Sequence, residues 1–158
     1  MNNQEFRIYR ANKNNTGAAS AIQLVEKEGK LFVFWTITKQ TGTDKDGNAS
    51  FGWKDKDKTI IFKMEDTDLG EILAVIYRFT DKVGGEKGLF HQNASGNTVF
   101  NFDGKSVRIS NKKKDAKEAN AISHGISHAE LALLKVIFET IVSKRFSNLW
   151  KKPTGGKF

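Results

Sequence analysis

The sequence predicts an α+β fold made of two tandem β-β-β-β-α units. The first observation is an internal echo: residues 71–79 and 132–140 place similar apolar residues in matching positions, at an offset of 132 − 71 = 61. The second is that each copy follows short runs of aromatic and β-branched residues, which are typical of strands. A unit this small cannot cover both faces of its own sheet, so it needs its twin or another subunit.

The composition favours a single domain with a basic surface. The chain has 158 residues, with 26 Lys and Arg against 18 Asp and Glu, so its formal net charge is +8. A basic domain attracts polyanions, of which nucleic acid is the commonest, although an incidental positive surface gives the same count. We predict one domain over residues 1–158, with repeats at about 6–80 and 88–150 and a basic tail at 151–158.

The chain has no cysteine, which excludes disulfides, a thiolate nucleophile and a cysteine-bound zinc. This fits a reducing compartment. No apolar run approaches the ~20 residues that a membrane helix needs. Because residues 6–10 already alternate as a strand does, the amino terminus leaves no room for a signal peptide. We therefore expect a cytoplasmic protein with no membrane partner.

The first unit is expected to contain four strands and a helix. Residue patterns predict strands at 6–11, 18–27, 31–40 and, interrupted by the charged run 54–58, at 51–64. A helix then begins near Asp66, Thr67 or Asp68, which are alternative N-caps. Its apolar face is spaced as in a helix and consists of Leu69, Ile72, Leu73, Ile76 and Phe79.

The second unit repeats this scheme more compactly. Short strands are predicted at 89–92, 98–102 and 105–110, followed by a long polar loop at 111–125. Ser127 and Glu130 form a capping box, and the helix runs to about Lys144 or beyond. Leu133 and Val136 widen its apolar face beyond the usual ~100° stripe. So wide a face favours packing between subunits over a helix buried within a monomer.

Aromatic and basic residues alternate on several predicted strands. Single strands of nucleic acid are held by cations that neutralise phosphates and by rings on which bases stack, for about 1–3 kcal/mol per base. The strand at 31–37 is apolar on both faces, so alternation alone does not select the binding face. We assign Tyr9, Trp35 and Trp53 to the surface. The rings assigned to the core are Phe32, Phe34, Phe62, Phe100 and Phe102.

Six local segments keep a characteristic order and spacing, at residues 6–10, 50–54, 58–64, 67–72, 88–92 and 126–134. Together they resemble the Whirly family of single-stranded-DNA-binding proteins, whose Whirly/PC4-like fold is shared with mitochondrial guide-RNA-binding proteins. The resemblance implies two antiparallel sheets packed against a helical core, and a homotetramer built on the helices. It also implies single-stranded DNA lying along the sheets, largely without sequence preference. The preference for Trp35 over Phe34 at the surface rests on this resemblance.

One family motif departs from the pattern. The family's lysine-containing motif falls near residues 14–20, where this chain keeps the small residues but has no lysine except the nearby Lys13. The cluster Lys112–Lys114 allows two interpretations, a phosphate clamp or a solvated tether. The candidate nucleic-acid-binding residues are Arg7, Tyr9, Lys13, Trp35, Lys39, Phe51, Trp53, Lys54, Arg108, Lys112 and Lys113.

Signals for enzymatic chemistry are weak, and we predict no catalytic residue, cofactor or metal. His124 and His128 straddle the expected N-cap, so they should not pair as on a helix, and a zinc site would need a third ligand such as His91. The acidic group at 65–68 suits a helix N-terminus. The predicted function is sequence-independent single-stranded DNA binding in replication, repair, recombination or transcription. The alternatives are RNA binding on the same fold, a partner-binding protein and a metal-dependent nuclease.

Overall fold

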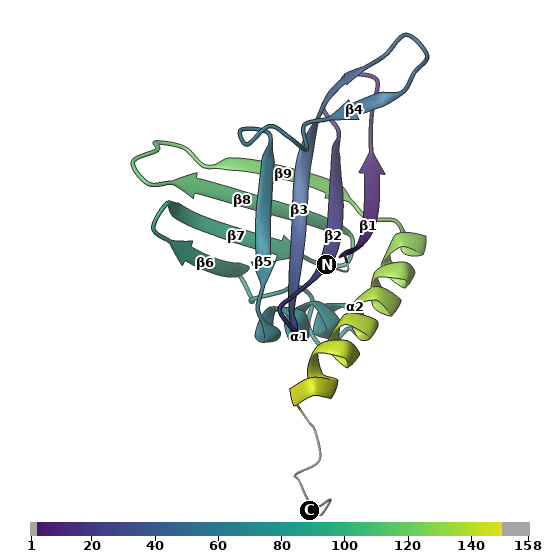
Figure 1. The fold of residues 1–158 in the computed structure, drawn as a ribbon. Helices are drawn as coiled ribbons and strands as arrows, with labels where there is room; N and C mark the ends of the chain where they lie inside the picture. The colour runs from purple at the N-terminus through teal and green to yellow at the C-terminus, as the bar shows by residue number, and fades with distance from the viewer. Residues whose placement is uncertain (1–2, 150–158) are drawn as a thin grey trace, which may run out of the picture.

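Two antiparallel sheets, each followed by a helix, make up the fold of residues 3–149, which the computed structural model describes (Figure 1). This confirms the predicted α+β class, and the predicted tail at 151–158 lies outside the described residues. The first unit consists of β1 (Asn3–Arg10), β2 (Ala18–Lys27), β3 (Lys30–Thr43), β4 (Ala49–Phe51), β5 (Thr59–Met64) and α1 (Asp66–Ile76). The second consists of β6 (Leu89–Asn93), β7 (Gly96–Phe102), β8 (Ser106–Lys113), β9 (Asn120–Gly125) and α2 (His128–Leu149).

The first sheet is four strands wide although it contains five strands. Its order is β1-β2-β3, and β4 and β5 then follow each other along one edge of β3. β4 pairs with residues 40–43 of β3, whereas β5 pairs with residues 33–38. The charged run 54–58 therefore interrupts what would otherwise be one strand, as the sequence predicts.

The hydrophobic core fills the space between the two sheets. The strands of the second sheet run across those of the first, and the two helices pack together at the side and base of the sheets (Figure 1). Phe62 of β5 stacks on Phe100 of β7, with ring centroids 5.1 Å apart, and both are fully buried. Leu134, Phe138 and Ile141 of α2 belong to the same core. Burying each large apolar side chain contributes roughly 1.5–3 kcal/mol.

Both helices begin at acidic or hydroxylated caps. Glu65 is the N-cap of α1, and the Asp68 carboxylate accepts its backbone N–H at 2.7 Å, so none of the three predicted N-caps is right. The acidic group does serve the helix N-terminus, where negative charge is favourable. At α2 the predicted capping box is confirmed. Ser127 N–H donates to Glu130 Oε1 at 2.8 Å, and Glu130 N–H donates to Ser127 Oγ at 3.1 Å.

Two predicted boundaries are wrong. Residues 120–125 form the edge strand β9, although the sequence analysis placed them in a polar loop. Within β9 only Ile122 and His124 are buried, so a single aliphatic side chain gives too weak an alternation to predict a strand. In addition, α1 ends at Ile76, and Phe79 lies beyond the helix with 81% of its surface exposed instead of extending the apolar face.

Candidate nucleic-acid interface

One face of the first sheet gathers four of the predicted binding residues. Arg7 and Tyr9 of β1 lie on the side that faces away from the second sheet, whereas Ile8 between them is buried. The ring of Phe51 lies 5.4 Å from that of Tyr9, and the Arg7 guanidinium lies 4.6 Å from the centre of the Trp53 ring. We call Arg7, Tyr9, Phe51 and Trp53 the sheet-1 patch.

Small side chains form the floor beneath the sheet-1 patch. Strand pairing sets Arg7 opposite Ala21, which in turn pairs with Thr36, and sets Tyr9 opposite Ala19, which pairs with Thr38. Although they lie on the outer face, these four floor residues are buried, with exposed fractions of 0–7%. The larger side chains of the patch therefore cover them. Tyr9 itself remains 48% exposed, which leaves ring surface available to a base.

The same outer face continues along β3 and β5. Phe32 and Phe34 are half-buried there, Ile61 is 59% exposed, and the Lys63 amine lies 5.0 Å from the centre of the Phe32 ring. Assigning Phe32 and Phe34 to the core was therefore wrong. The polar residues Thr36, Thr38 and Gln40 continue the same series of alternate positions on β3 as Phe32 and Phe34. That series of polar residues could have identified the outer face from the sequence.

The positive charge of the patch is held in place by neighbours. Arg7 donates hydrogen bonds to the Tyr9 hydroxyl at 3.3 Å and to the Glu5 carboxylate at 2.7 Å. These two bonds raise the pKa of Arg7, so its guanidinium stays charged. Lys54 and Lys56 are exposed on the loop that follows Trp53, while Lys58 lies 3.8 Å from Asp55. The face therefore combines rings with cations, as the binding of single strands requires.

Trp35 does not belong to this interface. It points to the opposite side of β3 and is fully buried, so its assignment to the surface was wrong. Its ring lies 5.2 Å from Phe100, 5.9 Å from Phe102 and 5.9 Å from Phe138, with the last pair stacked. The indole N–H donates to Ser20 Oγ at 2.8 Å, so the side chain is satisfied inside the core.

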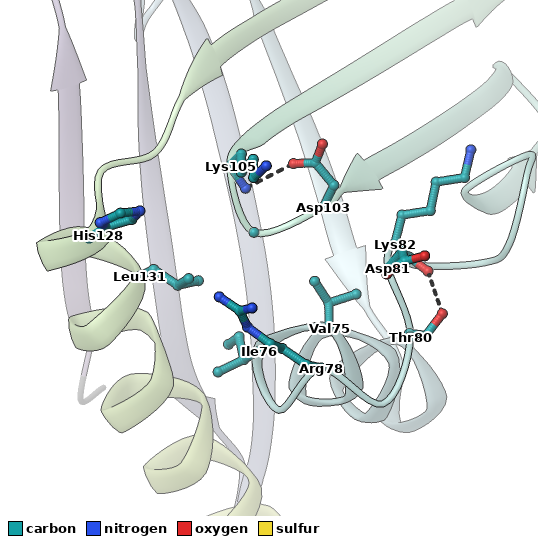
Figure 2. Close-up of a pocket in the computed structure, with 11 residues that line it drawn as sticks. Val75, Ile76, Arg78, Thr80, Asp81, Lys82, Asp103, Lys105, His128 and Leu131 are labelled. Atoms are coloured by element: carbon teal, nitrogen blue, oxygen red, sulfur yellow. Dashed lines mark hydrogen bonds between the residues drawn. The ribbon is translucent and has the colours of Figure 1, made fainter.

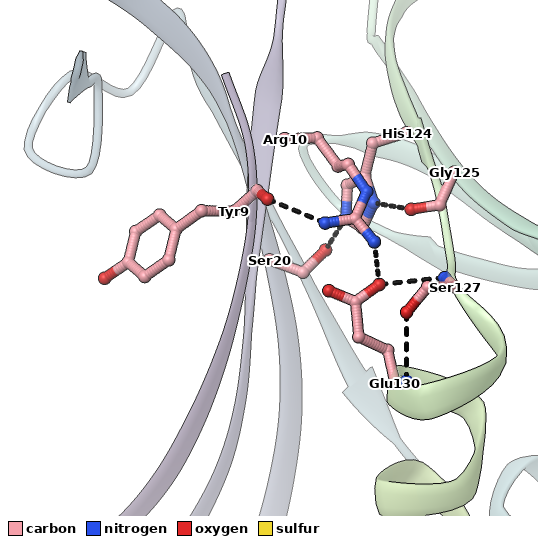
Figure 3. A network of polar contacts seen from close by, with 7 residues as sticks. All are labelled: Tyr9, Arg10, Ser20, His124, Gly125, Ser127 and Glu130. Atoms are coloured by element: carbon pink, nitrogen blue, oxygen red, sulfur yellow. Dashed lines mark hydrogen bonds and ion pairs between the residues drawn. The ribbon is translucent and has the colours of Figure 1, made fainter. Parts of the chain in front are cut away.

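A polar network links Trp35 to the start of α2. Ser20 Oγ lies 2.6 Å from His124 Nε2, and the other ring nitrogen of His124 lies 2.8 Å from the Gly125 carbonyl (Figure 3). Beside them, Arg10 forms an ion pair with Glu130, and its side chain and that of Tyr9 leave β1 on opposite sides (Figure 3). A neutral His124 with its proton on Nδ1 satisfies every partner, because Nε2 then accepts from Ser20.

The pH dependence of stability follows from this network. Burial lowers the pKa of His124; the Gly125 carbonyl and Glu130 oppose this effect, and the positive charge of Arg10 adds to it. The unfolded chain therefore binds a proton near its ordinary pKa of about 6.5 while the folded chain resists it. We expect the free energy of unfolding to fall as pH drops below about 6.5, by up to 1.4 kcal/mol per unit. Urea melts from pH 7.5 to 5 measure this, and His124→Gln should reduce the slope. An equal slope in that variant would contradict the assignment.

The remaining predicted residues are dispersed. Lys13 is exposed in the loop between β1 and β2, and Lys39 is exposed on the face of β3 opposite to the sheet-1 patch. Arg108 and Lys112 are exposed on the outer face of the second sheet, in β8. Lys113, the last residue of that strand, lies 3.6 Å from Asp57. The lysine cluster 112–114, which was expected in a loop, thus lies partly in β8, and Lys112 and Lys113 point to opposite sides of the strand.

A groove connects the two sheets next to Lys113 and Trp53. Its lining includes Trp53, Lys54 and Lys56 from the first unit and Asn111 and Lys113 from the second. The second sheet also carries an exposed ring that the sequence analysis did not select, Phe90, which is 55% exposed on β6. The sequence indicated the exposure of Phe90 only through strand alternation. Leu89 is buried, so the next residue of the short strand, Phe90, points to the outer side.

Two further observations bear on the kind of site. Within residues 3–149, no three His, Asp or Glu side chains come together as metal ligands would. His91 instead pairs with Asp68, at 2.9 Å, and stacks on Phe62. Neither helix in the described part of the chain has the length and apolar character to cross a membrane.

The arrangement of two crossed sheets and two packed helices is the fold of the Whirly proteins and of guide-RNA-binding proteins. WHY1 from Arabidopsis thaliana superimposes with a TM-score of 0.64, covering 94% of this chain and 90% of its own, at 15% identity. MRP1/MRP2 from Trypanosoma bruciei gives a TM-score of 0.60, covering 95% and 99%, at 13% identity. A guide-RNA-binding protein complex bound to a guide RNA gives 0.55, covering 92% of each chain, at 12% identity. Neither a family model nor a curated protein matches the sequence.

Proposed function

We propose that this protein binds single-stranded nucleic acid on the outer face of its first sheet, without enzymatic activity. The observation that carries the proposal is the sheet-1 patch, which places three aromatic rings and a guanidinium side by side over a floor of small residues. The shared fold supports it, because one similar structure is described as bound to a guide RNA. The net charge of +8 supports it as well.

The proposed mechanism combines stacking with phosphate neutralisation. Bases stack on Tyr9, Trp53 and Phe51, while Arg7 and the lysines of the following loop contact phosphates. Arg7 already lies against the Trp53 ring, so a base that stacks on that ring must displace the guanidinium toward the backbone phosphate. Every base has a ring face, so this mode discriminates little between sequences.

The groove between the sheets offers a continuation of the path. Trp53 belongs to both the patch and the groove, and Lys113 approaches from the second unit. A strand leaving the patch beside Trp53 would therefore meet the lysines of both units before it reaches Arg108 and Lys112 on the second sheet. Such a route would include Arg108, Lys112 and Lys113 among the dispersed cations, but not Lys13 or Lys39.

The test is a titration of labelled oligo-dT at two salt concentrations. We expect saturable binding whose affinity falls as salt rises, with a slope of log K against log salt of about −0.7 per phosphate contacted. No binding at low salt, or binding that does not depend on salt, would contradict the proposal. Degradation of the oligonucleotide when Mg²⁺ or Mn²⁺ is added would contradict the absence of enzymatic activity.

Single-stranded DNA is the ligand we propose, for roles in replication, repair, recombination or transcription, and RNA is the second candidate. The guide RNA in one similar complex favours RNA, whereas the sequence resemblance to Whirly proteins favours DNA. Competition between oligo-dT and oligo-U of equal length, at one salt concentration, separates them. The oligonucleotide that binds more tightly shows whether DNA or RNA is the preferred ligand.

We further propose that the exposed side of α2 joins copies of the chain into a homo-oligomer, with the tetramer that the resemblance implies. Leu133 is 50% exposed and Val136 is 60% exposed on this helix, on the side away from Leu134 and Phe138. Two adjacent exposed aliphatic residues on a helix that also packs inward fit a contact between subunits.

Replacing Val136 with Asp should break this contact without unfolding the chain. The side chain is exposed in the isolated protomer, so a carboxylate there costs little until two copies meet. We expect light scattering after gel filtration to report a smaller species than the wild type, with an unchanged circular dichroism spectrum. Thr140→Asp adds the same charge at another exposed position of α2, one helical turn after Val136. It should reduce the assembled mass less than Val136→Asp does. An unchanged mass for V136D would contradict the assigned contact.

A further inference from the structure

A second basic site lies away from both sheet faces, where the end of α1, the β7–β8 turn and the start of α2 meet. A cavity of about 490 Å³ opens there, which is the size of many small-molecule sites. Its inner wall is apolar and includes Val75 of α1 and Leu131 of α2. Arg78, Lys82, Lys105 and His128 line it with basic groups, as Figure 2 shows.

Arg78 holds an unusual backbone position at this cavity. The amide of Arg78 donates to the Val75 carbonyl at 3.0 Å and that of Phe79 to the Ala74 carbonyl at 2.8 Å, which is the Schellman pattern of a helix end. Arg78 occupies the left-handed position of this motif, with φ of 62°. Glycine is the residue usually found there, because a side chain is strained at positive φ. The backbone of this motif favours glycine, so the helix end does not by itself require an arginine at this position.

The basic side chains at the cavity have few competing partners. Among residues 3–149, the Arg78 guanidinium, the Lys105 amine and the His128 ring form no hydrogen bond or ion pair with another side chain. Lys82 reaches only the Glu86 carbonyl, at 3.3 Å. Figure 2 shows Arg78 pointing between the helices, toward Leu131 and His128.

Two carboxylates also line the cavity, and one of them is already occupied. Asp103 Oδ1 accepts the backbone N–H groups of Lys105 at 2.9 Å and Ser106 at 2.8 Å. Burial pushes the pKa of Asp103 up, but these bonds outweigh it and the pKa is lowered. Asp81 lies on the side of Lys82. Arg78 and Lys105 thus supply the positive charge of one side of the cavity, and His128 adds a ring nitrogen there.

We propose that this cavity binds a phosphate monoester, with the phosphate held by Arg78, Lys105 and His128 and the attached group against Val75 and Leu131. An arginine fork and neighbouring donors match phosphate oxygens. Gly104, next to Lys105, borders the apolar wall: an added Cβ would lie 3.8 Å from Val75 and from Leu131, and its φ of 83° suits glycine. The phosphate belongs either to a free nucleotide or to the 5′ end of a strand.

The test follows the backbone amides of Gly104, Lys105 and His128 by NMR during titration of the full chain at constant ionic strength. Inorganic phosphate and AMP are the probes. We expect saturable shifts of these amides, with AMP binding more tightly because its nucleoside adds apolar contact. No saturable shift with either probe up to about 10 mM, a concentration tenfold above a millimolar dissociation constant, would overturn the proposal.

Two variants make the test specific. Arg78→Gly removes the guanidinium and suits the left-handed backbone, so the variant should fold at least as stably and bind AMP about tenfold or more weakly. Lys87→Gln removes one charge from the same connecting segment outside the cavity and should leave AMP binding unchanged. Wild-type affinity in R78G, or equal losses in both variants, would overturn the site.

The source of the phosphate is decided by a third comparison. A 5′-phosphorylated dT oligonucleotide that shifts the cavity amides more than its 5′-hydroxyl counterpart identifies a strand end, and equal responses identify the free nucleotide. The cavity shares no lining residue with the sheet-1 patch, so Trp53→Ala should leave the AMP response unchanged. A loss of the AMP response in W53A would overturn the cavity as a separate site.

Discussion

Replacing Trp35 with Ala should remove about 3–5 kcal/mol from the free energy of unfolding, a large part of the 5–15 kcal/mol that a domain has. The side chain is fully enclosed and packs against Phe100, Phe102 and Phe138, so its removal leaves a cavity where both sheets and α2 meet. It also deprives Ser20 of the donor that completes the buried network with His124.

Urea unfolding followed by circular dichroism measures this loss. Trp35→Phe provides a graded control, because it keeps one ring but removes the indole N–H and part of the ring volume, so it should cost more than the roughly 1 kcal/mol of the hydrogen bond and less than Trp35→Ala. Trp53→Ala, a matched loss of the same residue type on the outer face, should change stability less than W35A. A stable W35A protein that has lost nucleic-acid binding would contradict the core assignment.

Replacing Trp53 with Ala should weaken single-strand binding by about 1–3 kcal/mol, roughly 5- to 150-fold in affinity, with the fold retained. Trp53 is half-buried at the junction of the sheet-1 patch and the groove, where it meets Arg7 and borders Lys54. The change removes one stacking surface and leaves the charge of the protein intact, so the slope of log K against log salt should stay nearly constant.

The comparison uses one unphosphorylated dT oligonucleotide in fluorescence anisotropy. Phe79→Ala is the matched control, because it removes an 81% exposed ring that lies outside both sheets. Its affinity should equal that of the wild type. Equal weakening in both variants, or none in W53A, would remove Trp53 from the interface.

The order of elements could be predicted from the sequence because most strands and both helices bury one clear face. β1 shows this best: Phe6 and Ile8 lie on the inner side, and Arg7 and Tyr9 on the outer side. The capping box at Ser127 is a local hydrogen-bonding pattern, so it too was predictable. β9 was not, because its burial depends on pairing with β8 and on a single isoleucine.

The candidate site was predicted in part, and β3 shows why. Arg7, Tyr9, Phe51 and Trp53 do come together, since β1, β4 and the turn after β4 carry them to the same face. The predicted locations of Trp35 and Phe34 were the reverse of the real ones. Both faces of β3 carry large apolar residues, and the resemblance favoured the wrong residue for the surface. The contacts of Arg78 with the cavity could not be predicted, since three segments distant in sequence form it.

The central claim is that unpaired nucleotides contact the outer face of the first sheet. Photocrosslinking an oligonucleotide that carries 5-iodouracil, followed by mass spectrometry of the linked peptides, tests it directly. The account predicts links to Tyr9, Phe51 or Trp53 that disappear when unlabelled oligo-dT competes. Competed links confined to α1 and α2, with none on the first sheet, would contradict it.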